Sequence, residues 1–349
     1  MFNIENIIRK NIKAAKPYSS ARDEYKGEAR IFLDANESAL GALIEGELSR
    51  YPDPYQTKIK EKLAEIKNIK PENIFLGNGS DEAIDLLFRA FCEPAKEKVI
   101  VLPPTYGMYQ VSAQINDIYA VEVALTENFE INTQKILSVV DEQTKLIFIC
   151  SPNNPSGNQI LENEIIKILE NFNGIVVVDE AYIDFAENPS SLKLLNKYKN
   201  LVVLQTFSKA WGMAALRVGM AFADESIIKI FNRIKPPYNI NALSQEKILL
   251  ALKEYSKLDN FIVEIKKQRY FLISELEKFP FVEKIFPSDA NFILVSVKNA
   301  TKIYNFLSNN GIIVRNRSNM PNCNSCLRIT VGSKQENIEL IETLAKFEI

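Results

Sequence analysis

The stretch GIVVVDEAY at residues 174–182 is an apolar, β-branched run that ends directly on acidic residues. Similar runs recur between amphipathic stretches of the chain: VIVLP at 99–103, KLIFICS at 145–151 and LVVLQT at 201–206. Continuous apolar runs of this length are typical of parallel strands that are covered by helices on both faces. The sequence therefore predicts an α/β fold, with a doubly wound sheet in a large domain over residues 46–240.

The pattern changes after the proline pair at 236–237. Residues 241–278 contain no glycine or proline and predict a long helical stretch. Short strand signals follow at 291–297, 311–314 and 326–332, and the chain closes on a helical stretch at 334–347. We expect a second, smaller α+β domain over residues 241–349.

The composition is that of an ordinary globular protein: 46% of the 349 residues are hydrophobic and 25% are charged. The 42 basic and 44 acidic residues leave no excess of cations for a polyanion, so we expect no nucleic-acid partner. The N-terminus is broken by charges, and no apolar run approaches the ~20 residues that span a bilayer. We expect a cytoplasmic protein without a membrane partner.

Histidine is absent from the chain. This excludes Ser-His-Asp and Cys-His nucleophile schemes and every histidine-ligated metal site. If the protein is an enzyme, its proton carrier must be a lysine, a tyrosine, a carboxylate or part of a cofactor.

Four cysteines are too few for a disulfide framework in a chain of this size: Cys92, Cys150, Cys323 and Cys326. The last two form a C-x-x-C pair, for which metal binding and redox exchange are possible interpretations. We favour ordinary structural cysteines and no metal, because a second pair is lacking and a strand signal follows where a thioredoxin-type motif would open a helix.

Polar motifs follow three of the predicted strands, at the edge where ligands bind in open α/β sheets: SPNNPSG at 151–157, DEAY at 179–182 and TFSK at 206–209. Asp179 is either a helix cap or a buried carboxylate that requires a cation, such as a protonated ring nitrogen. Lys209 is either solvated or, among its apolar neighbours, poised as the neutral amine that forms a Schiff base.

A phosphate site is indicated by the glycines of GNGS, residues 77–80, which precede a helical stretch. Free N–H groups at a helix N-terminus bind phosphate, although the same motif can be a plain turn and cap. Ser208 and Arg217 favour the phosphate interpretation, since a dianion binds hydroxyl donors and bidentate arginine. An amine for a Schiff base, an acid for a ring nitrogen and a phosphate cradle together predict pyridoxal 5′-phosphate.

With these motifs the sequence resembles the fold-type I aminotransferases, and among them the class-II histidinol-phosphate aminotransferases. The resemblance covers the whole chain and rests on ordered motifs: LDANES (33–38), RYPDPY (50–55), GNGSDEAIDLLFRAFCEP (77–94), PPTYGMY (103–109), CSPNNPSGN (150–158), VVDEAYIDF (177–185), TFSKAWGMAALRVG (206–219) and CLRITVG (326–332). It implies a large domain with a mostly parallel seven-stranded sheet and a smaller α+β domain. It also implies a homodimer with shared active sites, in which residues 1–45 pack with the small domain and the partner subunit.

The resemblance assigns cofactor roles to individual residues. Lys209 carries the covalent bond to the cofactor and shuttles protons, and Asp179 pairs with the ring nitrogen. Asn154 and Tyr182 hydrogen-bond the ring oxygen, and Tyr106 stacks on the ring. The phosphate group is assigned to Ser80, Asp81, Thr206, Ser208 and Arg217, with Tyr51 reaching it from the partner subunit.

For the substrate, the resemblance assigns Arg328 to the glutamate carboxylate. Arg315 would join it on the substrate phosphate, although the motif RNR offers Arg317 as a second candidate. Tyr18 would contribute from the partner subunit, and Asn36 lies in the expected active-site loop.

The implied reaction is amino transfer between L-histidinol phosphate and 2-oxoglutarate, a step of histidine biosynthesis. Both substrates carry an anion at the far end, so one arginine can serve both. An aminotransferase for aromatic or branched amino acids, and a threonine-phosphate decarboxylase of the same fold, stay open at this point. A pyridoxal-phosphate-binding regulator without enzymatic activity is a remote alternative, because no helix-turn-helix pattern precedes RYPDPY.

Overall fold

The computed structural model describes residues 2–18 and 30–348. Its larger sheet has seven strands in the order β1-β7-β6-β5-β4-β2-β3. The strands are β1 (Ile74–Asn78), β2 (Lys98–Val101), β3 (Tyr119–Glu122), β4 (Thr144–Cys150), β5 (Ile175–Asp179), β6 (Leu201–Thr206) and β7 (Val218–Ala223). β7 pairs antiparallel with both β1 and β6, and the remaining pairs are parallel. The mostly parallel seven-stranded sheet of the predicted fold class is confirmed.

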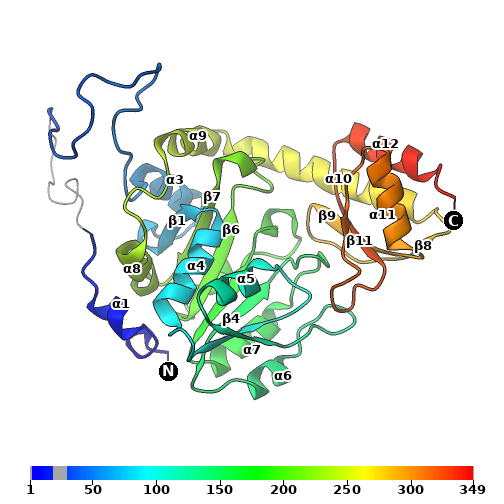
Figure 1. Cartoon of the computed structure of the whole chain (residues 1–349), viewed down its shortest axis with the longest axis horizontal. Coiled ribbons are helices and arrows are strands. Elements are labelled where there is room, and N and C mark those ends of the chain that lie inside the picture. The colour runs from blue at the N-terminus through cyan, green and yellow to red at the C-terminus, as the bar shows by residue number, and fades with distance from the viewer. Residues whose placement is uncertain (1, 19–29, 349) are drawn as a thin grey trace.

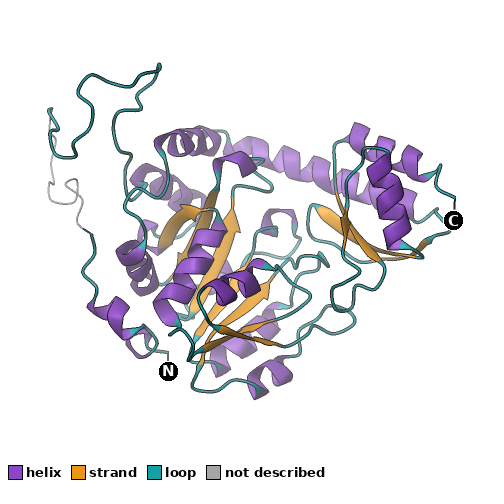
Figure 2. Ribbon diagram, in the orientation of Figure 1, coloured by secondary structure: helices purple, strands orange, loops and turns teal. Residues whose placement is uncertain are grey.

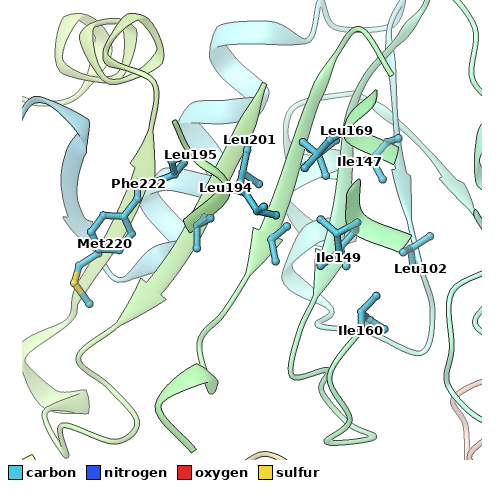
Figure 3. Packing of buried hydrophobic residues seen from close by; sticks show 14 of the residues in the cluster. Leu102, Ile147, Ile149, Ile160, Leu169, Leu194, Leu195, Leu201, Met220 and Phe222 are labelled. Carbon is cyan, nitrogen blue, oxygen red and sulfur yellow. The ribbon is translucent and has the colours of Figure 1, made fainter. Parts of the chain in front are cut away.

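Helices cover both faces of this sheet, as Figures 1 and 2 show. They are α3 (Thr57–Lys67), α4 (Ser80–Phe91), α5 (Met108–Ile115), α6 (Thr133–Ser138), α7 (Glu162–Asn171), α8 (Glu225–Ile234) and α9 (Ala242–Lys253). Successive strand residues alternate between two cores: Ile147 and Val176 lie in one, and Phe148 and Val177 in the other. Figure 3 shows part of the first core. The central strands β4, β5 and β6 consist mainly of apolar residues because both of their faces are buried.

The smaller sheet has four antiparallel strands in the order β10-β11-β9-β8. They are β8 (Val282–Ile285), β9 (Phe292–Val297), β10 (Arg315–Asn316) and β11 (Cys326–Thr330). One face packs in a core with α10 (Leu258–Leu276), α11 (Ala300–Asn309) and α12 (Lys334–Leu344). In Figure 1 the long helix α10 runs from the region of α9 to this sheet, so it links the two parts of the chain.

In this region one sequence prediction is refined and one was wrong. The stretch 241–278 is two helices, α9 and α10, separated by the short 3-10 turn Tyr255–Lys257. At this turn Tyr255 stacks on Trp211, and Leu258 packs in a separate small core with Tyr182. Residues 311–314 form no strand, since the ladder with β11 involves only 315–316.

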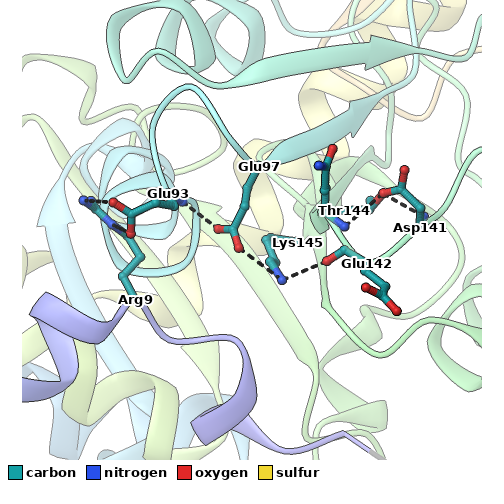
Figure 4. Close-up of polar contacts among 8 residues, drawn as sticks. Arg9, Glu93, Glu97, Asp141, Glu142, Thr144 and Lys145 are labelled. Carbon is teal, nitrogen blue, oxygen red and sulfur yellow. Dashed lines mark hydrogen bonds and ion pairs between the residues drawn. The ribbon is translucent and has the colours of Figure 1, made fainter.

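The N-terminal helix α1 (Lys10–Ala14) is anchored to the large sheet through Arg9. The Arg9 Nε donates to Glu93 Oε2 at 3.2 Å, and the Glu93 N–H donates to Glu97, which pairs with Lys145 at the start of β4 (Figure 4). Residues 30–50 contain no helix or strand and stand away from both sheets in Figure 1. We call residues 30–50 the arm.

Candidate active site

A cavity of about 150 Å³ lies where β4, β5 and β6 end, at their carboxyl edge. All parallel strands present their carboxyl ends on the same edge, which brings together motifs that are far apart in the sequence. Ten residues singled out from the sequence line this cavity: Ser80, Asp81, Tyr106, Asn154, Asp179, Tyr182, Thr206, Ser208, Lys209 and Arg217.

Asp179 is the last residue of β5 and is almost completely buried. The Tyr109 hydroxyl donates to its Oδ2 at 2.7 Å, and the Ala181 N–H donates to its Oδ1 at 3.1 Å. Burial raises the pKa of the Asp179 carboxyl from 3.8 to about 6, although both hydrogen bonds oppose this shift. Among the described residues no cation forms an ion pair with this carboxylate, and the Lys209 ammonium interacts with its charge only at longer range.

Tyr109 was missed by the sequence analysis. It is fully buried in α5, where its ring stacks on Phe148 with centroids 4.8 Å apart. Its only sequence signal is its position three residues after Tyr106, one helical turn along PPTYGMY. That spacing does not reveal a partner that lies 70 residues further along the chain.

Lys209 follows β6 at the mouth of the cavity. Its neighbours Phe207 and Ala210 are buried. Lys209 as a whole is exposed to solvent, although its side chain lines the cavity. Its ammonium group lies 5.5 Å from the centroid of the Tyr182 ring. Burial of that group, followed by repulsion from Arg328, lowers the pKa of the Lys209 amine, so the neutral form is more accessible than in a solvated lysine.

Gly79, Ser80, Ser208 and Arg217 also line the cavity, and we call this group the cradle. Gly79 precedes α4 with a φ of 73° and donates its N–H to the Arg217 carbonyl at 2.7 Å. A Cβ atom at Gly79 would lie 2.7 Å from Arg217 Nη2, so a side chain there would displace the guanidinium. The N-terminus of α4 and Arg217 thus face one space, where both favour negative charge.

Two side chains beside the cradle already have internal partners. Asp81 accepts a hydrogen bond from the Tyr106 hydroxyl at 3.0 Å and lies 3.6 Å from Arg217 Nη2. The Thr206 hydroxyl accepts the Ser208 N–H at 3.1 Å and donates to the Val218 carbonyl at 3.4 Å. Thr206 therefore shapes the turn that carries Ser208.

The smaller sheet contributes Arg328. Its Nη1 donates to Asn154 Oδ1 at 2.5 Å, and its guanidinium lies 5.2 Å from the centroid of the Phe292 ring. Asn154 Nδ2 in turn donates to the Tyr182 hydroxyl at 3.4 Å. Arg315 lies directly opposite Arg328 in the ladder between β10 and β11. Arg328 therefore connects the smaller sheet to the cavity through Asn154, which lines the cavity.

Comparison with known proteins identifies the family. The family model "Aminotransferase class I and II" matches residues 22–344. The chain belongs to this family. A histidinol-phosphate aminotransferase from Cytophaga hutchinsonii is 53% identical over 346 residues, which are 99% of each chain.

Solved structures of aminotransferases have the same fold. The histidinol-phosphate aminotransferase from Clostridium acetobutylicum is 26% identical, with a TM-score of 0.79 over 85% of this chain and 90% of that chain. The enzyme from Sinorhizobium meliloti, solved with pyridoxal-5′-phosphate, is 23% identical, with a TM-score of 0.77 over 89% of this chain and 90% of that chain. The fold and the aminotransferase family predicted from the sequence are confirmed.

Five predicted residues of this aminotransferase do not line the cavity of the chain: the substrate arginines Arg315 and Arg328, and Tyr18, Tyr51 and Asn36. Tyr18 and Tyr51 are largely exposed, and the Tyr51 ring stacks on Tyr238 with centroids 4.5 Å apart. Both were expected in the cavity of a partner subunit. Asn36 lies in the exposed arm with a φ of 54°, and the structure does not bring it to the cavity.

The four cysteines of the aminotransferase are free thiols and buried. In the described ranges no group of three or more acidic or cysteine side chains could hold a metal ion. Within the same ranges, no helix is long and apolar enough to cross a bilayer.

Proposed function

We propose that this aminotransferase transfers an amino group between L-histidinol phosphate and 2-oxoglutarate, with pyridoxal 5′-phosphate as its cofactor. The proposal is carried by one observation: an amine, a buried carboxylate and the cradle surround a single cavity. The near-complete coverage and 53% identity of the Cytophaga hutchinsonii relative support the choice of substrate.

The residues fit this cofactor. Its phosphate suits the cradle of Arg217, Ser208 and the α4 N-terminus, where a Cβ at Gly79 would intrude. Its protonated ring nitrogen would supply an ion-pair partner for Asp179. Asn154 and Tyr182 would donate hydrogen bonds to the ring oxygen, and Tyr106 would pack on the ring face.

The bound cofactor supplies an electron sink that makes the α-proton of the substrate acidic. Lys209 would hold the cofactor covalently and, once the substrate amine has taken its place, would hold the α-proton at its Nζ and return it. The lowered pKa of this amine increases the fraction in the neutral form, which is the form that can accept a proton. Asp179 would pair with the protonated ring nitrogen, and Tyr109 orients that carboxylate.

Arg328 and Arg315 would bind the anionic end of each substrate, because they adjoin one another across β10 and β11. Asn36 and Tyr18 are proposed as further substrate contacts, Tyr18 from the partner subunit. The phosphate of histidinol phosphate and the far carboxylate of glutamate would occupy the same place in turn.

A half-reaction panel on the holoenzyme tests the choice of substrate. Histidinol phosphate should convert the cofactor to its amine form faster than phenylalanine or leucine does. Threonine phosphate should release no CO₂. Preference for phenylalanine would favour an aromatic aminotransferase, CO₂ release would favour the decarboxylase, and no conversion with any of them would favour a regulator.

Arg217 is expected to hold the cofactor phosphate. Arg217→Met should raise the dissociation constant of the cofactor about ten- to a hundredfold, since hydrogen bonds to a charged group are lost. Fluorescence titration of the apoprotein measures this constant. Arg89→Met is the matched control, because Arg89 lies on the same helix as the cradle but pairs with Asp85. An unchanged constant in Arg217→Met would contradict the role.

The homodimer is proposed because the arm exposes apolar side chains, including Leu40 and Leu43, which are fully accessible in the single chain. Tyr51 would then serve the partner's cavity. We expect Lys209→Ala and Tyr51→Ala chains, each impaired alone, to regain about a quarter of the wild-type activity when refolded together, because half of the dimers contain one native site. Activity that equals the mean of the two separate variants would show that Tyr51 acts within its own chain.

A further inference from the structure

Three arginines gather on one face of the smaller sheet. Arg315 and Arg328 are direct cross-strand partners, so their side chains point to the same face. Arg317 continues this register, because its N–H donates to the Cys326 carbonyl at 2.8 Å. Since residues two apart on a strand share a face, Arg317 lies on the face of Arg315 and Arg328.

This face looks toward the large sheet. Leu294, the cross-strand partner of Arg328 in β9, packs in the core of the large sheet, as do Cys323 and Cys326. Leu327 and Ile329, on the opposite face, pack in the core of the smaller domain. The arginine cluster, defined as Arg315, Arg317 and Arg328, therefore faces the side on which the cavity lies.

The arginine cluster has no anionic partner in the part of the chain that the structure describes. The ion pairs there involve other residues, and Arg328 donates to the neutral Asn154. Burial and mutual repulsion lower the pKa of both Arg317 and Arg328. Like charges that lie opposite each other across a ladder destabilise the fold. A bound anion would relieve the repulsion among these three guanidinium groups.

Two guanidinium groups also leave buried donors unused. The Nε atoms of Arg317 and Arg328 are buried and have no hydrogen-bond partner. Buried donors without partners cost free energy, and native structures rarely retain them without a reason. Arg317 is close enough to Tyr182, which lines the cavity, for the tyrosine to affect the pKa of its guanidinium.

We infer that Arg317 is a third substrate-anion ligand, and that it favours a phosphate monoester over a carboxylate. A carboxylate offers two oxygens and one charge, which Arg328 and Arg315 can satisfy together. A phosphate monoester offers three terminal oxygens and about −1.5 to −2 charges at pH 7, so a third guanidinium gains a partner only with this ligand. Arg317 thus discriminates between the two substrates of the same site.

This inference rests on the proposed function and is tested on the reconstituted holoenzyme. Arg317→Gln should lower kcat/KM for the histidinol phosphate half-reaction about ten- to a hundredfold, which corresponds to a lost charge-assisted hydrogen bond. The glutamate half-reaction should change by no more than about threefold, because a carboxylate leaves Arg317 unused. Stopped-flow measurement of the cofactor absorbance gives kcat/KM for both half-reactions.

Lys284→Gln is the matched control, since it removes one positive charge from the exposed edge strand β8 of the same sheet. It should leave the ratio of the two half-reactions unchanged. Arg317→Lys, which retains the charge but not the planar fork, should lose less selectivity than Arg317→Gln and serves as the test if the glutamine variant misfolds. Equal losses for both substrates, or no loss, would overturn the inference.

A second measurement separates this inference from the proposed function. Propyl phosphate and glutarate, which have no amino group, are used as inhibitors of the glutamate half-reaction. Arg317→Gln should weaken inhibition by propyl phosphate about tenfold or more and leave glutarate inhibition nearly unchanged. If the wild-type enzyme does not convert histidinol phosphate, the proposed substrate is wrong, whereas parallel changes in both inhibition constants would refute the role of Arg317.

Discussion

Lys209→Ala is expected to lower the turnover of the holoenzyme by at least about 10⁴-fold, because one side chain supplies both the covalent bond to the cofactor and the proton shuttle. Among the described residues, Lys209 is the sole lysine that lines the cavity. The nearby cations Arg217 and Arg328 are guanidinium groups, which do not deprotonate and so cannot replace the amine.

The measurement combines turnover with the mass of the chain after borohydride treatment. Wild-type protein should retain the cofactor covalently at Lys209, and Lys209→Ala should not. Lys229→Ala is the control, since Lys229 lies exposed on α8 and pairs with Glu225. Added ethylamine, which fits the gap left by the lysine side chain, should restore part of the activity. A variant that retained more than about one per cent of turnover would refute the proton-transfer role of Lys209.

Asp179→Asn is expected to lower turnover by roughly 10²- to 10³-fold, because the cofactor ring nitrogen would lose its buried counter-ion. Asparagine has nearly the same shape and can accept the Ala181 N–H as Asp179 does. The loss of turnover should therefore reflect the missing negative charge and not a change of shape. Asp184→Asn is the control, since Asp184 also has a pKa raised by burial but pairs with Lys67.

The same substitution should stabilise the apoprotein at alkaline pH. The pKa of Asp179 rises from 3.8 to about 6 on folding, so the folded state binds its proton more tightly than the unfolded state does. This contribution to stability is complete below pH 4 and is lost as the pH rises through 6. The shift of about two units corresponds to about 3 kcal/mol of stability that the wild-type apoprotein has below pH 4 and lacks at pH 8.

Urea denaturation of the apoprotein at pH 4.5 and pH 8 measures this effect. Asp179→Asn, which cannot ionise, should raise the free energy of unfolding at pH 8 and have a smaller effect at pH 4.5. With cofactor bound at pH 8, the wild type should have the higher free energy of unfolding, because the protonated ring nitrogen compensates the charge of Asp179. An equally large gain at both pH values would indicate a packing effect and would contradict the role of the charge.

The strands that carry the candidate site were predictable from the sequence because they are buried on both faces. β4, β5 and β6 each contain a run of consecutive apolar residues that polar residues follow directly or within the same strand. β1 and β3 are harder to recognise: β1 contains two polar or glycine residues, and β3 lies at the edge of the sheet with its ends exposed. A run of apolar residues in the sequence indicates a buried strand, so a strand at the edge of the sheet that is less buried is harder to recognise.

By itself, the sequence determined the fold class from its apolar runs, and the family and ten residues that line the cavity from the resemblance of its motifs; the motifs after β4, β5 and β6 meet because parallel strands place their carboxyl ends together. The tertiary structure alone decided that Tyr109 bonds Asp179 and that Arg317 joins Arg315 and Arg328. These contacts depend on how a helix packs on a sheet and on which residues face one another across a ladder. These contacts join residues that are far apart along the chain, so the local periodicity of the sequence does not reveal them.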